Sequence, residues 1–284
     1  QIESEDIYLR TYADGSKLQQ ETEDGLVDVS SSVMRTIVNI HTATGVDGLK
    51  TNGTQVLATQ TGFNYWYVKD GKITSSAAYN QILEPDNNVE PFSEFTEVKN
   101  GNDNWNNGRT YMYSGTALFQ AQEGDGLQHK LSVCNDNRYV YYQFAQLLQK
   151  ADMVMSSNYI FGLAGASHVI GFIPTNEAIS TAIAAGQIPG MDATGAVTSS
   201  SKLRQYLLSY FIRDRENALI SYPYPGSAMK SSTYVTASGK SLTYTDSGSS
   251  LSIMVDGKVA NVISDYNFVP FAFDDGCFQL IDTV

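Results

Sequence analysis

The stretch that decides the fold is residues 169–178, which read Val-Ile-Gly-Phe-Ile-Pro-Thr-Asn-Glu-Ala. The first five residues carry no polar side chain, which is typical of a buried strand. Pro174 ends this strand, and Thr175 is placed to cap a short helix that Gly186 closes. The sequence therefore predicts a core strand that turns sharply into a capped helix, beneath the last strand of the chain.

Two further helices are predicted on either side of this stretch. Before it, Phe144, Leu147 and Leu148 fall on one face of a helix. After it, residues 203–212 carry apolar side chains at positions i, i+4, i+7 and i+8, and the serines in front of them are candidate N-caps.

Three stretches of the chain occur twice in the same order. Residues 30–35 resemble 199–204, residues 68–73 resemble 254–259, and residues 107–113 resemble 275–281. The middle pair carries Asp-Gly between β-rich flanks, which predicts a hairpin with a two-residue turn in each copy. The chain is therefore interpreted as two copies of one helix-then-strands unit.

The two copies are unequal. The residues before Ser30 are too few and too polar to form the helix, strand and capped helix that precede Ser199. The seam between the copies lies near residues 121–131, where Glu-Gly-Asp-Gly is typical of a linker. We expect an incomplete unit over residues 1–125, which holds the back half only, and a complete unit over residues 126–284.

Residues 169–178 resemble the signature of the fasciclin family, in which a strand runs into Pro-Thr-Asn-Glu-Ala and a helix. Residues 278–284, Phe-Gln-Leu-Ile-Asp-Thr-Val, are similar to the closing strand of that family, and residues 203–212 lie where it has its Leu-rich helix. The resemblance covers roughly residues 134–284, and residues 30–120 as a back half only. It implies an α+β fold, a fasciclin-like wedge of small, mostly antiparallel β-sheets packed with short helices, in two units.

The resemblance also implies cell adhesion. Many fasciclin domains carry a Tyr-His pair just after the Leu-rich helix, and this pair is implicated in adhesion. Here the corresponding positions hold Ile40 and His41 in the first unit and Tyr210 and Phe211 in the second, so neither pair is intact. These four residues, with Trp105 on an Asn- and Gly-rich loop, are the candidate partner-binding residues.

The charge of the chain excludes several classes of partner. Among 284 residues, 18 Lys and Arg stand against 30 Asp and Glu, so the formal net charge is −12. An acidic chain lacks the basic face that binds nucleic acid or an anionic membrane. Because only 17% of the residues are charged and loops are rich in Asn and Gly, we expect an extracytoplasmic protein of the bacterial cell envelope or surface. Its export signal would have been trimmed, and a lipoprotein anchor would lie upstream of Gln1.

Motifs for catalysis are absent from the sequence: there is no His-Glu-x-x-His, no Walker A run and no Gly-x-Ser-x-Gly. Two cysteines and three histidines cannot form a disulfide scaffold or a four-ligand zinc site. His129 is interpreted as a linker residue, His168 as a strand-edge residue and Asp275 as a solvated turn residue. The sequence is compatible with two states of Cys134 and Cys277: two free buried thiols, or a disulfide between them. We expect no enzyme activity, no cofactor and no metal.

The functional hypothesis is a non-catalytic extracellular or cell-surface module that binds a protein or glycan partner, such as a cell-surface or matrix protein. The alternative is a carbohydrate-binding envelope protein that uses the exposed aromatic residues Trp105 and Trp66, because aromatic rings stack on sugars. A truncated first unit leaves an open sheet edge, so self-association through that unit is also expected.

Overall fold

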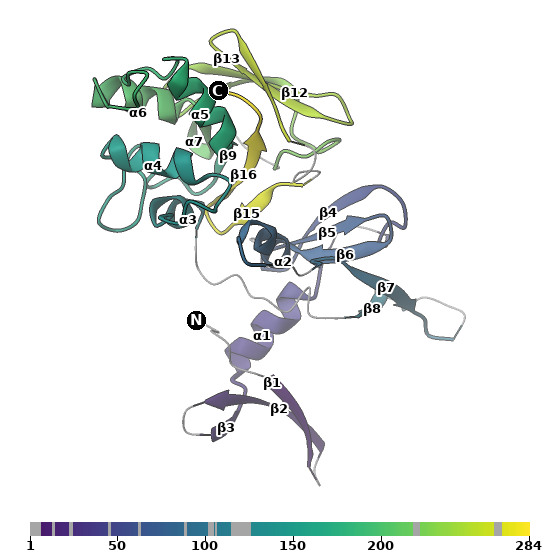
Figure 1. Ribbon diagram of the computed structural model, residues 1–284. Helices are drawn as coiled ribbons and strands as arrows, with labels where there is room; N and C mark the ends of the chain where they lie inside the picture. The colour runs from purple at the N-terminus through teal and green to yellow at the C-terminus, as the bar shows by residue number, and fades with distance from the viewer. Residues whose placement is uncertain are drawn as a thin grey trace. The chain divides into compact units, whose positions relative to one another are not determined.

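The computed structural model describes residues 7–12, 15–22, 25–44, 47–61, 64–87, 90–101, 105, 107–114, 126–217, 222–263 and 269–284 (Figure 1). The chain divides into two compact units. Unit 1 comprises Gln1–Tyr79 and Glu90–Gly124, and unit 2 comprises Asn80–Val89 and Asp125–Val284. Unit 2 therefore takes one short segment from the first half of the sequence.

Unit 1 contains two antiparallel sheets, with orders β1-β2-β3 and β4-β5-β6-β7-β8. Its described elements are β1 (Ile7–Tyr12), β2 (Gly15–Thr22), β3 (Gly25–Asp28), α1 (Ser31–Ile40), β4 (Thr54–Ala58), β5 (Tyr65–Lys69), β6 (Lys72–Ser75), α2 (Ser76–Asn80, whose last residue belongs to unit 2), β7 (Ser93–Val98) and β8 (Thr110–Tyr113). Val68 and Ile73 pair across β5 and β6 and form a buried cluster with Trp66, Phe95 and Tyr113 packed against it.

Unit 2 contains a mixed sheet of order β10-β9-β16-β15 and an antiparallel sheet of order β11-β12-β13-β14. Its described elements are η1 (Gln81–Leu83), α3 (Leu127–Ser132), α4 (Tyr142–Lys150), β9 (Val169–Pro174), α5 (Asn176–Ala184), α6 (Ser200–Leu208), β10 (Phe211–Arg213), α7 (Asp214–Asn217), β11 (Ser232–Val235), β12 (Ser241–Asp246), β13 (Leu251–Val255), β14 (Lys258–Asn261), β15 (Phe271–Phe273) and β16 (Gly276–Ile281). The prediction of an α+β chain with small, mostly antiparallel sheets and short helices is confirmed.

The core of unit 2 is the pairing of β9 with β16. The two strands run parallel in a six-residue register from Val169↔Gly276 to Pro174↔Ile281. Every residue of both strands is buried, as expected for a parallel pair that is covered on both faces. The predicted core strand lies directly beside the last strand of the chain, with the helices gathered on one side of the sheet (Figure 1).

The helix that follows β9 has the predicted caps at both ends. The Thr175 hydroxyl accepts a hydrogen bond from Ala178 N at 3.3 Å. At the other end Gly186 has φ +65°, and its N–H donates to Ile183 O while Gln187 N donates to Ala182 O. These are the two hydrogen bonds of a Schellman motif, which needs a left-handed residue at this position. Local chemistry therefore sets both ends of α5.

Both copies of the Asp-Gly pair form the predicted hairpin turns. Asp70 and Gly71 join β5 to β6, and Asp256 and Gly257 join β13 to β14, with positive φ at all four residues. Positive φ at both central residues is the geometry that a type I′ turn requires.

Three sequence expectations in unit 2 are corrected by the structure. The helix expected over residues 203–212 ends at Leu208, because Phe211 and the next two residues pair with β9 as strand β10. His129 lies inside helix α3 rather than in a linker. The Asp275 carboxylate is not a solvated turn group: it accepts hydrogen bonds from Leu127 N at 2.5 Å and Gln128 N at 3.3 Å, and so caps α3.

Cys134 and Cys277 are both free and both buried, so there is no disulfide between them. Burial raises the pKa of the Cys134 thiol to about 11 and raises the pKa of the Cys277 thiol well above its ordinary value. A buried thiol that stays protonated is a poor nucleophile, and both cysteines therefore act as small core residues.

We expect Gly276→Ala to destabilise unit 2 by about 3 kcal/mol, because a Cβ at Gly276 would lie 2.0 Å from Val169 O and the backbone there has φ +156°. Gly257→Ala is the matched control: its φ is also positive, but a Cβ would meet open space, and the expected cost is about 1 kcal/mol. The measurement is hydrogen exchange of the β9 amides. Equal losses of protection in the two variants would contradict the assigned close approach.

Both thiols should resist alkylation by iodoacetamide in the folded protein at pH 8. With a pKa of about 11, only about one Cys134 side chain in a thousand is a thiolate at that pH, and burial likewise raises the pKa of the Cys277 thiol. In urea both should react at the rate of an ordinary free cysteine. Fast modification of either residue under native conditions, read by intact mass, would show that its burial is wrong.

Candidate functional site

Three of the five predicted contact residues are buried. Ile40, Tyr210 and Phe211 belong to the hydrophobic cores of their units. Tyr210 packs edge-on against Phe144 at 5.8 Å between ring centroids and donates its hydroxyl to Tyr206 Oη at 2.7 Å. A side chain enclosed in this way cannot reach a partner, so these positions, which were inferred from the resemblance, serve packing instead.

His41 is half-buried and connects the end of α1 to β8. Its Nδ1 lies 2.7 Å from Ile37 O, and its Nε2 lies 3.0 Å from the Tyr113 hydroxyl. Because a carbonyl oxygen only accepts a hydrogen bond, Nδ1 is the donor in the contact with Ile37 O. The ring also stacks on Tyr113 at 6.1 Å. This histidine is engaged inside unit 1.

The two tryptophans of the chain differ in exposure. Trp66 is half-buried against the Val68 and Ile73 cluster, and its indole N–H donates to Ile40 O at 2.8 Å. Trp105 is 43% exposed on the β7–β8 connection, and its indole N–H donates to Val98 O at 3.1 Å. Of the two tryptophans, Trp105 is therefore the more exposed, and its indole N–H is bonded to its own hairpin.

The surface that sequence reasoning missed is the loop of residues 153–163 in unit 2. It carries three large apolar side chains in solvent: Met155, Tyr159 and Phe161 are 42%, 48% and 54% exposed. The loop folds back on itself, with a bridge between Val154 and Ile160 and a hydrogen bond from Met155 N to Tyr159 O at 2.8 Å. The exposed apolar residues therefore lie on a small ordered hairpin.

Helix α3 holds the inner side of this loop. The Gln128 side-chain oxygen accepts from Ile160 N at 3.2 Å, and the Ser132 hydroxyl donates to Asn158 O at 3.1 Å. Asn158 has φ +58°, a left-handed conformation that Asn tolerates in turns. The C-terminal side of the turn is thus bonded to one helix at two positions.

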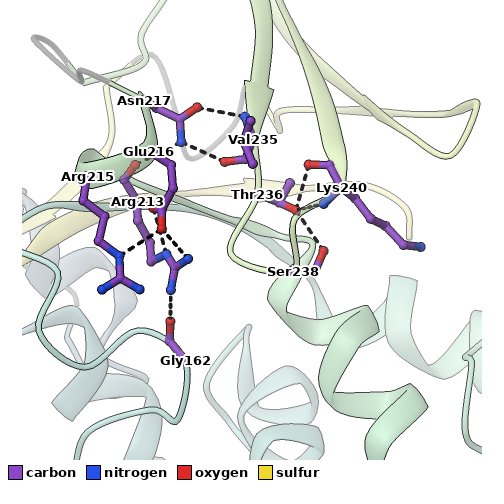
Figure 2. A network of polar contacts seen from close by, with 9 residues as sticks. All are labelled: Gly162, Arg213, Arg215, Glu216, Asn217, Val235, Thr236, Ser238 and Lys240. Carbon is purple, nitrogen blue, oxygen red and sulfur yellow. Dashed lines mark hydrogen bonds and ion pairs between the residues drawn. The ribbon is translucent and has the colours of Figure 1, made fainter.

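Two arginines hold the flanks of the loop. Arg204 of α6 donates to Ala151 O at 2.6 Å, and its guanidinium lies 5.8 Å from the centroid of the Phe161 ring. Arg213 of β10 donates to Gly162 O at 2.7 Å and binds both carboxylate oxygens of Glu216 (Figure 2). Planar forked donors of this kind fix geometry as well as charge. Side chains from α6 and β10 therefore bond to the backbone just before the loop and near its end.

Figure 2 also shows the contacts between α7, which follows β10, and the second sheet of unit 2. The Asn217 side chain donates to Val235 O at 2.7 Å and accepts from Val235 N at 2.8 Å, as a neighbouring strand would do. The next residue, Thr236, bridges to β10 at Ile212, and its hydroxyl accepts from Lys240 N at 3.1 Å. The corner that anchors the loop thus also joins the two sheets of the unit.

A serine, a histidine and an aspartate also meet at the start of β9, but their connections do not match a catalytic relay. The Ser167 hydroxyl donates to Asp214 rather than to His168, and His168 Nδ1 lies 3.5 Å from the Tyr222 hydroxyl. Burial raises the pKa of the Asp214 carboxyl, and hydrogen bonds from Ser167 and the backbone of His168 outweigh that effect, so the pKa falls. The serine is thus bonded to the aspartate, and the histidine does not lie between them as it does in a Ser-His-Asp relay.

Within the residues that the structure describes, no three His, Cys, Asp or Glu side chains gather in a way that could hold a metal ion. Of the described helices, none has both the length and the apolar character needed to span a membrane.

No protein-family model matches this chain, and no curated protein matches it. Among solved structures, the chain is similar to the FAS1 domain pair from the insect cell adhesion molecule Fasciclin I. The two sequences are 13% identical, the match covers 89% of this chain and 79% of that chain, and the TM-score is 0.36. A similarity this low does not establish the family, so the function is inferred from the geometry of the chain itself.

Proposed function

We propose that this chain is a non-catalytic extracellular or cell-surface binding module that adheres to a protein partner through Met155, Tyr159 and Phe161 of loop 153–163. The observation that carries the proposal is the exposure of three large apolar side chains on a loop held by α3, α6 and β10. Aromatic and methionine side chains are enriched at protein interfaces because they bury much area per residue.

The anchoring of the loop supports a binding role on energetic grounds. Fixing the backbone of a flexible segment costs about 1–2 kcal/mol for each residue that becomes ordered on binding. Here Gln128, Ser132 and Arg213 bond to backbone groups of the loop, and Arg204 bonds to the backbone at Asp152, just before it. Most of the free-energy cost of ordering the loop backbone is therefore incurred on folding and not on binding. Burial of the exposed rings by a partner can then contribute to the affinity.

A location outside the cytoplasm, in a bacterial cell envelope, belongs to the same proposal. The low fraction of charged residues, the net charge of −12 and the Asn- and Gly-rich loops support it. Recovery of the native protein in a cytosolic fraction would contradict this part of the proposal.

The adhesion proposal is tested with the double variant Tyr159→Ser and Phe161→Ser. Beads coated with the unaltered chain should adhere to at least one member of a panel of cells, matrix proteins and glycans. The double variant should bind that target at least about tenfold more weakly, because a central aromatic contact contributes about 2 kcal/mol or more.

The matched control for this test is Met254→Ser with Val259→Ser. These two side chains are similarly exposed in unit 2 but lie on the solvent face of β13 and β14. The control should keep full adhesion, and both variants should keep the far-ultraviolet circular dichroism of the unaltered chain. Failure of coated beads on every surface, or an equal loss in both variants, would count against the proposal.

The second candidate function is glycan binding through Trp105, which is favoured by its exposure and by the hydrogen bond that orients its ring. Trp66 does not support this alternative, because its ring packs on the core of unit 1 and its N–H is bonded to Ile40 O.

On a glycan array, Trp105→Ala should abolish any binding that depends on sugar stacking, while Trp105→Phe should keep part of it because a phenyl ring also stacks. Neither change should alter the free energy of unfolding, measured by thermal denaturation, by more than about 1 kcal/mol, since the ring is partly in solvent. Binding that persists in Trp105→Ala would remove the tryptophan from the site.

A further inference from the structure

Strand β8 forms one edge of the larger sheet of unit 1. Among the described residues it pairs with β7 alone, from Val98↔Thr110 to Phe95↔Tyr113. Ser114 N donates to Glu94 O, so these two residues form a hydrogen-bonded pair. Hydrogen-bonded pairs alternate along an antiparallel ladder, so Met112 and Thr110 also direct their backbone groups toward β7. The N–H and C=O groups of Tyr111 and Tyr113 therefore point toward the outer edge.

The outer edge of β8 is held in place by its own side chains. The Tyr111 hydroxyl accepts from Leu49 N at 3.0 Å, and the Tyr113 hydroxyl bonds to His41. Between them Met112 is 65% exposed, and the strand Thr-Tyr-Met-Tyr carries no charge and no proline. Charges, prolines and bulges are the usual protection of an edge strand against pairing, and β8 has neither of the first two.

The opposite edge of the same sheet is different. Ala43 forms a bridge with Thr59 just after β4, and the Gln55 side chain donates to Gly48 O and accepts from Lys50 N. This segment of unit 1 thus bridges to the chain just after β4, whereas it reaches β8 through the hydroxyls of Tyr111 and Tyr113, and no described strand pairs with the outer edge of β8.

In unit 2 the strand equivalent to β8 has a paired strand on each of its two edges. In the internal repeat, Thr110–Tyr113 aligns with residues 278–281 of β16. That strand pairs with β15 on one edge, as β8 pairs with β7, and with β9 on the other edge in parallel register. Strand β9 is Val-Ile-Gly-Phe-Ile-Pro, uncharged and fully buried. Unit 1 has the counterparts of β15 and β16 but no described counterpart of β9.

We infer that the free edge of β8 binds an extended, uncharged peptide strand rich in branched and aromatic side chains, in the parallel orientation in which β9 binds β16. The backbone groups of Tyr111 and Tyr113 supply the hydrogen bonds, and Met112 supplies an apolar neighbour for one face of the incoming strand. A peptide with charged side chains is disfavoured because the strand Thr110–Tyr113 carries no charge of its own and the adjacent Arg109 is already paired with Glu97. The inference is independent of loop 153–163 and of the adhesion proposal.

The test uses the full chain and a synthetic peptide with the β9 sequence, Val-Ile-Gly-Phe-Ile-Pro, followed by a Gly-Ser-Lys tail. Saturable binding should slow hydrogen exchange of the Tyr111 and Tyr113 amides by about tenfold or more. A control peptide with proline in place of the central Gly-Phe should give no protection, because proline cannot donate.

The matched variants are Met112→Lys and Met254→Lys. Met112→Lys places a charge on the edge and should weaken peptide binding by about tenfold, while it keeps the hairpin, because the native side chain is exposed. Met254, 40% exposed on β13 between two paired strands, should tolerate lysine with unchanged binding. Both tryptophans lie in unit 1, so their fluorescence reports whether that unit stays folded.

Three outcomes would overturn the inference. The first is no saturable protection of Tyr111 and Tyr113. The second is protection in unit 2 alone, through exchange of the peptide for β9. The third is a dimer that forms without peptide, protects these two amides from exchange, and dissociates when Met112 is changed to lysine. In that case the occupant of the edge is a second copy of the chain, which is the self-association expected from the sequence.

Discussion

The parallel pairing of β9 with β16 is the constraint on which unit 2 depends. Parallel strands cannot be joined by a tight turn, so the chain must leave β9 and return beside it. Helices α5 and α6, strands β10 to β14 and the hairpin of β15 all lie within that return. The close approach is possible because Gly276 has no side chain where Val169 O lies. One local choice of residue therefore permits two strands that lie far apart in the chain to pair.

The candidate contact surface follows from this arrangement. Strand β10 is fixed by its antiparallel pairing with β9, and β10 carries Arg213 to the carbonyl of Gly162. Helix α6 precedes β10 and carries Arg204 to the backbone at Ala151. The apolar side chains of loop 153–163 thus lie on a loop whose position is fixed by contacts to β10 and to the helix before it. An apolar side chain on a fixed loop needs less ordering on binding than one on a mobile segment.

The two units use the same local devices with different results. A serine run begins a helix in each, and an Asp-Gly turn closes a hairpin in each. In unit 2 the strand after these elements is buried between two neighbours, whereas in unit 1 the corresponding strand β8 has alternating exposed and half-buried residues. Side chains of Tyr111 and Tyr113 stabilise β8 from one face only. This difference in pairing makes unit 1 the place where a further strand can add.

The sequence by itself determined the features that rest on neighbouring residues: the strand that ends at Pro174, the Thr175 cap, the Gly186 terminus and the two Asp-Gly turns. Each depends on backbone preferences and hydrogen bonds within a few residues, which the order of residues specifies directly. The tertiary structure alone decided where residues 211–213 leave the helical pattern for β10, why Asp275 caps a helix far away in the chain, and which aromatic residues stay in solvent. Tyr210 and Phe161 are both large and apolar in the sequence, but exposure depends on what packs against each ring, and those neighbours come from distant segments.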